Sequence, residues 1–280
     1  MRNGRIPARA VARGFSLVEL AVVMAIVAFL LGGMIFTLSA QVEQRNFEET
    51  RRRIDQAREL IIAFAIINGR LPCPARTAAT AAPVTVAGDE VVTTATGCIG
   101  DGVTDYYGGT IVVGPPSVTG GFLPARAIGY QQVDSAGFAV DAWGNRLRYV
   151  VANLITNCSG SSTTPHFVNS TNLKTNGISC QPNDLLICKS ATGITGTTCG
   201  GAANQIMAQS LVAAIIYSTG KNGSGAAGGI DEAANLNGDR VFVYHTPTPG
   251  TAANGEFDDQ FAWITVGEVY GKLISAGILP

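Results

Sequence analysis

The sequence predicts an α+β fold, in which a long N-terminal helix with a membrane-spanning first half packs on an antiparallel β-sheet head with long disulfide-stapled loops. Three observations predict it. Residues 20–42 hold no charged side chain. Apolar residues then continue at helical spacing as far as Phe64. After Pro74 come short runs rich in Val, Ile and Thr, separated by turn residues, and six cysteines follow the uncharged stretch.

Composition excludes several classes of protein. Of 280 residues only 14% are charged, against roughly 25% in a typical soluble domain. The formal net charge of −1 argues against a nucleic-acid partner, because such proteins usually carry a clear basic excess. The apolar share of 46% supports a sizeable core and argues against a disordered chain.

The uncharged stretch 20–42 is long enough to cross a membrane, since about 20 apolar residues span a bilayer. The positive-inside rule places the N-terminus in the cytoplasm and the rest of the chain across the membrane. This orientation rests on the flanking charges, which are Arg2, Arg5, Arg9 and Arg13 before the stretch and Glu43, Glu48 and Glu49 after it.

A cleaved secretory signal is the competing interpretation of this stretch. Its cleavage site would lie among the small residues at 38–41. However, the apolar core of such a signal usually has about 7–15 residues, fewer than the 23 positions found here. A second boundary precedes the stretch, at Gly14-Phe15.

The residues at this second boundary carry a family resemblance. The run Arg13-Gly14-Phe15-Ser16-Leu17-Val18-Glu19-Leu20 resembles the class III signal of type IV prepilins and type II secretion prepseudopilins. The resemblance implies that a membrane-bound prepilin peptidase cuts between Gly14 and Phe15 and methylates the new amino terminus of Phe15. It also implies a pilin-like fold. Residues 1–14 are then a leader peptide.

Glu19 is the acidic residue that immediately precedes the predicted span. Insertion scales assign a charge at a helix centre a cost of about 2.5–3.5 kcal/mol, so such residues usually have a partner. The resemblance implies one, the free amino terminus of an adjacent subunit in a filament, which would set the register of assembly. The alternative is that Glu19 lies in the lipid headgroup region.

The predicted helix covers residues 15–69 and leaves residues 70–280 as a periplasmic globular head. Beyond the span, Ile54, Ala57, Ile61 and Phe64 form one apolar stripe. Asn68-Gly69 is a typical helix C-terminus, and the two prolines that follow forbid continuation.

The head is predicted to consist mainly of strands. A helix is assigned to residues 204–214, although their alternation is ambiguous, and a short closing helix to Val266–Leu279. The segments 141–149 and 256–263 resemble the Asp-Pro-Trp-Gly-Asn turn, with its buried Trp, and the closing Phe-Asp-Asp segment of pseudopilin heads. The strand candidates are Val84–Val86, Thr110–Val113, Leu147–Val151, Leu185–Cys188, Ile215–Tyr217 and Val241–Tyr244.

Six cysteines in an oxidising periplasm favour up to three disulfides. Spacing favours Cys73–Cys98 and a set within 158–199, and the remaining pairing stays open. Structural zinc is disfavoured because no Cys-x2-Cys pair exists and His166 and His245 are the only histidines. The candidates are Cys73, Cys98, Cys158, Cys180, Cys188 and Cys199.

Two further patterns raise the question of a ligand. Residues 223–228 spell G-x-G-x-x-G, but no helix opens there and Asp231-Glu232 follow in a predicted polar loop, so a surface loop is favoured over a dinucleotide site. The pseudopilin resemblance implies a calcium loop with Asp258 and Asp259 as ligands, the alternative being that they cap a loop. Other nearby oxygen donors are Ser218, Asn222, Asp231 and Asp239, and no other cofactor is expected.

The sequence therefore predicts a structural subunit, a pseudopilin or minor pilin of a type II secretion pseudopilus or type IV pilus. Its expected partners are prepilin peptidase, other pilin or pseudopilin subunits and the bacterial inner membrane, before it enters the filament. No enzyme motif surrounds either histidine or Ser224. Two alternatives stay open: a tip adhesin or DNA-uptake pilin, and a membrane-anchored periplasmic protein that does not assemble.

Overall fold

The computed structural model of the chain forms two compact units, residues 1–45 and 46–280. It describes residues 16–76, 88–90, 92–93, 97–98, 110–111, 118–119, 121–152, 155–156, 166–223 and 228–279. Within these ranges, the side chains at 31, 33–39, 92–93, 97, 110–111, 118–119 and 155–156 are not described. The second unit is the head, together with the C-terminal part of the long helix.

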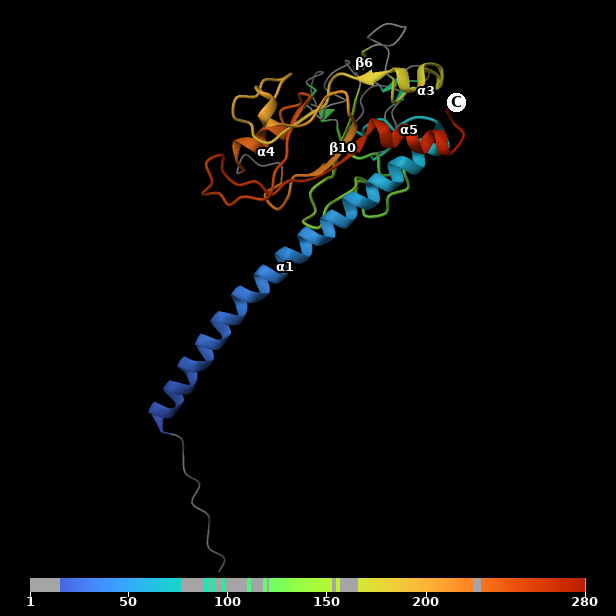
Figure 1. Cartoon of the computed structure of the whole chain (residues 1–280). Helices are drawn as coiled ribbons and strands as arrows, with labels where there is room; N and C mark the ends of the chain where they lie inside the picture. Colours follow the sequence, from blue (N-terminus) through green and yellow to red (C-terminus); the bar gives the residue numbers. More distant parts are fainter. Residues whose placement is uncertain are drawn as a thin grey trace, which may run out of the picture. The chain divides into compact units, whose positions relative to one another are not determined.

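Helix α1 (Leu17–Asn68) has 52 residues and is the blue ribbon of Figure 1. It ends where the sequence predicts. Gly69 adopts a left-handed φ of +67°, which a residue with a Cβ adopts at a steric cost, and its amide donates to the Ala65 carbonyl at 2.8 Å. The predicted start at Phe15 lies outside the described residues.

The apolar stripe of α1 packs into the head core, as predicted. Ile54, Ala57 and Ile61 are almost wholly buried, and Phe64 lies beside them in the same cluster. On an adjacent face, Arg58 makes two 2.6 Å bonds to the Glu268 carboxylate and a third, of 3.3 Å, to the Trp263 carbonyl. The stripe and the ion pair together fix the head half of α1 against the C-terminal segment.

The main sheet of the head has three antiparallel strands in the order β12-β10-β5. They are β5 (Arg148–Val151), β10 (Val212–Ser218) and β12 (Gln260–Thr265). Every residue of β10 is buried, as expected of a central strand covered on both faces. The register places Ile216 of β10 between Tyr149 and Ala262.

A second sheet, of order β11-β8-β9, departs from the prediction. It contains β8 (Leu186–Cys188), β9 (Gln205–Met207) and β11 (Val241–Val243). β8 pairs with β11 in parallel and with β9 antiparallel, so the head is mixed rather than antiparallel. The helix assigned to 204–214 is wrong, because β9 and the start of β10 occupy this segment.

The other elements are short. Two-residue strands pair as β1 (Val92–Thr93) with β2 (Gly97–Cys98), β3 (Thr110–Ile111) with β4 (Val118–Thr119), and β6 (Ile155–Thr156) with β7 (Gln181–Pro182). The short helices are α3 (Ser170–Asn176), α4 (Ile230–Asn235) and α5 (Val266–Ser275), with 3-10 turns η1 (Gly177–Ser179) and η2 (Ala202–Asn204). Of the predicted elements, the closing helix is α5, whereas the strand at Val84–Val86 lies outside the described residues.

Disulfides staple the loops of the head. Cys73 is joined to Cys98, the pair that spacing favoured, and Cys188 to Cys199. Cys180 is also disulfide-bonded. Cys158 lies outside the described residues.

Tyr270 of α5 bonds both to the buried His166 and to Cys180, which lies between η1 and β7. His166 Nε2 lies 2.8 Å from the Tyr270 hydroxyl, which donates to the Cys180 carbonyl at 2.8 Å. The hydroxyl therefore accepts the proton of the neutral ring. Burial lowers the pKa of His166 to about 4.

Replacing Ile61 by alanine will test how the apolar stripe of α1 packs into the head core. Ile61 is fully buried, so Ile61→Ala is expected to reduce the free energy of unfolding of the head by about 3 kcal/mol. Ile67→Ala is the matched control on the same helix, because Ile67 is 82% exposed and its loss should cost less than about 0.5 kcal/mol. Urea unfolding of the detergent-solubilised chain measures both, and equal effects would contradict this packing.

Acid should destabilise the head through His166. Its pKa is about 4 when folded and about 6.5 when unfolded. Between these values the unfolded chain alone binds the proton, so stability is lost as the pH falls from 7 to 4. The loss at pH 4 should be roughly 3 kcal/mol smaller in His166→Gln. Urea unfolding at each pH measures this difference, and parallel pH profiles for the two proteins would contradict it.

Candidate functional site

The described chain begins one residue after the predicted cleavage site, at Ser16. The Ser16 amide donates to Glu19 Oε2 at 2.9 Å, and the Glu19 amide donates to Ser16 Oγ at 3.2 Å. This reciprocal pair is a capping box, which satisfies backbone amides that the first helical turn leaves free. Glu19 is thus held in the first turn of α1, while Gly14 and Phe15 lie outside the described residues.

Apolar side chains cover the N-terminal part of α1 and are exposed in the single chain. Phe29 is 90% exposed and Leu17 is 85% exposed. Monomeric soluble proteins rarely expose an apolar surface of this extent. The other large exposed members are Val18, Leu20, Val22, Val23, Met24, Ile26, Val27 and Leu30.

None of the helices, as far as their residues are described, has the length and hydropathy required of a membrane span. The side chains at 31 and 33–39, inside the predicted span 20–42, lie outside the described residues. The span therefore stays a prediction.

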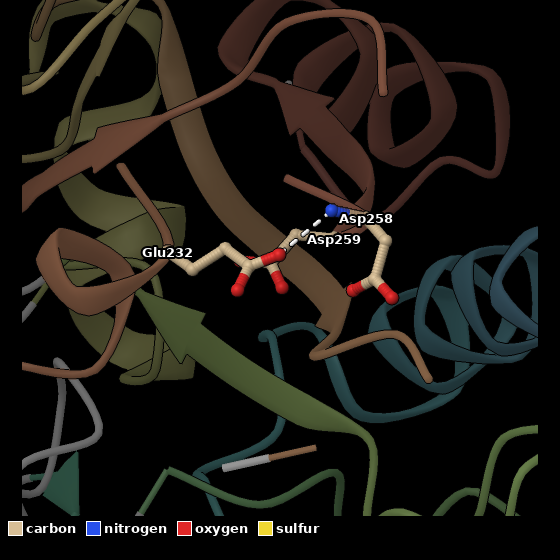
Figure 2. Close-up of side chains that lie close together, drawn as sticks. All are labelled: Glu232, Asp258 and Asp259. Carbon is tan, nitrogen blue, oxygen red and sulfur yellow. Dashed lines mark hydrogen bonds between the residues drawn. The ribbon is translucent and has the colours of Figure 1, made fainter. Parts of the chain in front are cut away.

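A buried acidic cluster lies in the head. It consists of Glu232 from α4 and of Asp258 and Asp259, which immediately precede β12. One carboxylate oxygen from each lies within 4.8 Å of the others, and each residue is at most 5% exposed. Figure 2 shows the Glu232 carboxylate against the Asp258 backbone nitrogen.

Backbone and amide donors hold Glu232 and Asp258 in place. The Asp258 amide donates to Glu232 Oε1 at 2.7 Å, and the Asn222 side chain donates to Glu232 Oε2 at 2.8 Å. The Lys221 amide donates to Asp258 Oδ2 at 2.9 Å. The loop containing Lys221 and Asn222 thus forms one wall of the acidic cluster.

Two carboxylate oxygens of the acidic cluster differ in whether they have a hydrogen-bond partner. Asp259 Oδ2 accepts a 2.7 Å bond from the Asn235 side chain. Asp258 Oδ1 is buried and has no hydrogen-bond partner among the residues that the structure describes. A buried carboxylate oxygen without a donor is unfavourable, so its presence indicates a site suited to a cation.

Burial and repulsion between like charges raise the pKa values of two carboxyl groups in the acidic cluster. Burial, followed by the negative charge of Glu232, raises the pKa of Asp258 to about 7. Burial, with smaller contributions from Glu232 and Asp258, raises the pKa of Asp259 well above its ordinary value. Among the described residues, no ion pair joins Lys or Arg to these three carboxylates.

The structure separates the predicted oxygen donors. Asn222 contacts the acidic cluster, but Ser218 donates to Asp141 and Asp239 accepts from the Val241 amide. Asp231 accepts from the Ala191 amide and the Asn254 side chain, away from Asp258. The prediction that Asp231-Glu232 lie in a polar loop is wrong, since both are buried in α4.

Comparison with known proteins identifies the N-terminal segment. Residues 9–35 match the family model of the prokaryotic N-terminal methylation motif. The chain carries a type IV pilin-like prepilin signal. No curated protein and no solved structure matches the chain. The match covers the predicted cleavage site, Glu19 and the first part of α1 in this prepilin-like chain.

The histidines of this prepilin-like chain are tied into structure. His245 Nε2 lies 3.1 Å from Asp231 Oδ2, and its Nδ1 lies 2.7 Å from the Thr246 carbonyl. A ring engaged at both nitrogens has neither available as a general base. His166 contacts Tyr270 in the core.

Proposed function

We propose that this chain is a structural subunit of a filament, a pseudopilin or minor pilin of a type II secretion pseudopilus or type IV pilus. The observation that carries the proposal is the methylation motif at residues 9–35, followed by a helix with an uncovered apolar surface. Prepilin peptidase cuts after Gly14 and methylates Phe15. The head then lies in the periplasm, held at the inner membrane by residues 20–42.

The exposed apolar side chains of α1 form the surface through which subunits contact one another. In the precursor they contact lipid, and in a filament they contact the helices of neighbouring subunits. Association within lipid depends on close packing and polar contacts. Glu19 provides the polar contact, because its carboxylate pairs with the free amine of an adjacent subunit. Its own capping partner, Ser16, keeps the carboxylate at the helix start until then.

The mature N-terminus tests this function directly. Membrane extracts of cells that contain prepilin peptidase are expected to yield a chain that begins with N-methyl-Phe15. Intact-mass measurement followed by fragmentation identifies the terminus. An intact Met1, or a terminus near Gln41, would overturn the proposal.

Glu19→Gln should still be cleaved but lost from filaments, whereas Glu43→Gln on the same helix should assemble.

We also propose that the acidic cluster holds Ca²⁺. The donor set fits, because calcium prefers six to eight oxygen ligands and is often bound by carboxylates. Glu232, Asp258 and Asp259 supply the carboxylates, and Asp258 Oδ1 has no other partner among the described residues. A bound cation supplies the positive charge that offsets the repulsion between these buried groups.

Calcium should raise the melting temperature of the head. The detergent-solubilised full chain, first treated with EDTA, is expected to melt about 5–10 °C higher at a calcium concentration 100 times the Kd. Asp258→Asn should abolish this rise without lowering the melting temperature in EDTA, because it removes a buried negative charge that no cation balances when calcium is absent. Circular dichroism at increasing temperature provides the measurement.

Glu256→Gln is the matched control for Asp258→Asn. Glu256 is a nearby acid outside the acidic cluster, so its loss should leave the calcium response intact. A calcium response that survives in Asp258→Asn, or that is absent from the wild-type chain, would refute this site.

A further inference from the structure

One loop is bonded both to the acidic cluster and to the turn Asp141–Asn145. This loop, Ser218–Gly223, starts at the last residue of β10 and is here called the coupling loop. We infer that the coupling loop links cation binding at Glu232, Asp258 and Asp259 to the turn that holds the head half of α1. The inference rests on the calcium site proposed above.

The coupling loop bonds directly to the acidic cluster. The Lys221 amide and the Asn222 side chain donate to Asp258 and Glu232, as described. Gly220, at φ +63°, lies so close that a Cβ added there would fall 1.8 Å from Asp258 Oδ1. The loop backbone therefore lies against the carboxylate and has little freedom to shift while the carboxylate is fixed.

The coupling loop also bonds to the turn Asp141–Asn145. Ser218 Oγ donates to Asp141 Oδ2 at 2.6 Å, with both residues buried. The Asn145 side chain donates to the Gly220 carbonyl at 2.7 Å. Gly220 thus touches Asp258 on one side and Asn145 on the other.

The turn Asp141–Asn145 also contacts α1 directly. The Ala142 amide donates to Thr50 Oγ1 at 3.1 Å, and Arg53 donates to the Asp141 carbonyl at 2.7 Å. Trp143 packs edge-on against Phe47, with ring centroids 4.9 Å apart. Three contacts thus join the turn to residues of α1 that are spaced three positions apart.

Calcium binding and opening of the turn are thermodynamically linked, because both depend on the position of the coupling loop. Opening of the turn breaks its bonds to Ser218 and Gly220, which releases the coupling loop from its place against Asp258. If the open form does not bind the cation, bound calcium disfavours opening by the factor 1 + [Ca²⁺]/Kd, about 100-fold at a concentration 100 times the Kd. The grip on α1 thereby becomes dependent on calcium although no residue of α1 belongs to the acidic cluster.

Hydrogen exchange in the full chain tests this coupling. In detergent micelles, calcium at 100 times the Kd is expected to slow exchange of the Ala142, Trp143 and Asn145 amides by at least 10-fold and at most about 100-fold. The Lys221 and Asp258 amides should slow as well. The Asn172 amide, which donates to the N-cap side chain of Asn169 at the start of α3, should not change.

Two outcomes separate this inference from the calcium site. Protection at Lys221 and Asp258 with none at 142–145 would overturn the coupling and leave the site standing. No calcium-dependent protection at any of these amides would overturn both.

A variant sharpens the test. Asn145→Ala removes the bond to Gly220 and is expected to reduce calcium protection at Ala142 and Trp143 while leaving protection at Lys221. Asn237→Ala, which removes an asparagine bonded to Asp239 in an exposed turn, is the matched control and should behave as wild type. Unchanged protection of the turn in Asn145→Ala would contradict the coupling.

Discussion

The head depends on one buried carboxylate, that of Asp141, which is 1% exposed. Its Oδ1 accepts the Trp143 and Asn145 amides, and its Oδ2 accepts the Ser218 hydroxyl. Burial raises the pKa of Asp141, and these hydrogen bonds act in the opposite direction by stabilising the ionised form. Without this carboxylate the turn would keep its backbone hydrogen bonds, but it would lose the two bonds to the Trp143 and Asn145 amides and the bond to Ser218 of β10.

The turn at Asp141 explains how a helix and a sheet become one head. α1 buries its apolar stripe in the core, but burial alone leaves a helix free to slide or rotate. Directional bonds to Thr50 and Arg53 fix its position along the axis. Trp143, which the resemblance implies to be buried, is only half-buried, and its ring packs against Phe47.

Charge is handled in two contrasting ways in the same head. Arg70 and Glu90 form a bidentate pair with bonds of 2.7 and 2.8 Å, and Glu90 also accepts the Cys73 amide next to a disulfide. The acidic cluster has only neutral donors among the described residues. A pair of opposite charges is complete within the chain, whereas three buried carboxylates gain from an external cation.

Local and periodic signals in the sequence were enough to predict part of this structure. The signal around Gly14, Phe15 and Glu19 can be identified from consecutive residues, and a family model matches it. The end of α1 follows from Gly69 and the prolines, and the buried face from the spacing of Ile54 and Ile61. These features need no knowledge of distant contacts.

The tertiary structure alone decided the features that depend on residues far apart in the chain. Glu232 rather than Asp231 enters the acidic cluster because α4 turns one of two adjacent acids toward Asp258, and only packing selects which. β8 and β11 pair in parallel through a long connection, and residues 205–207 and 212–214 become strand because neighbouring strands supply their partners. Hydrogen bonds between distant segments leave no pattern in local residue spacing, so they could not be predicted from the sequence.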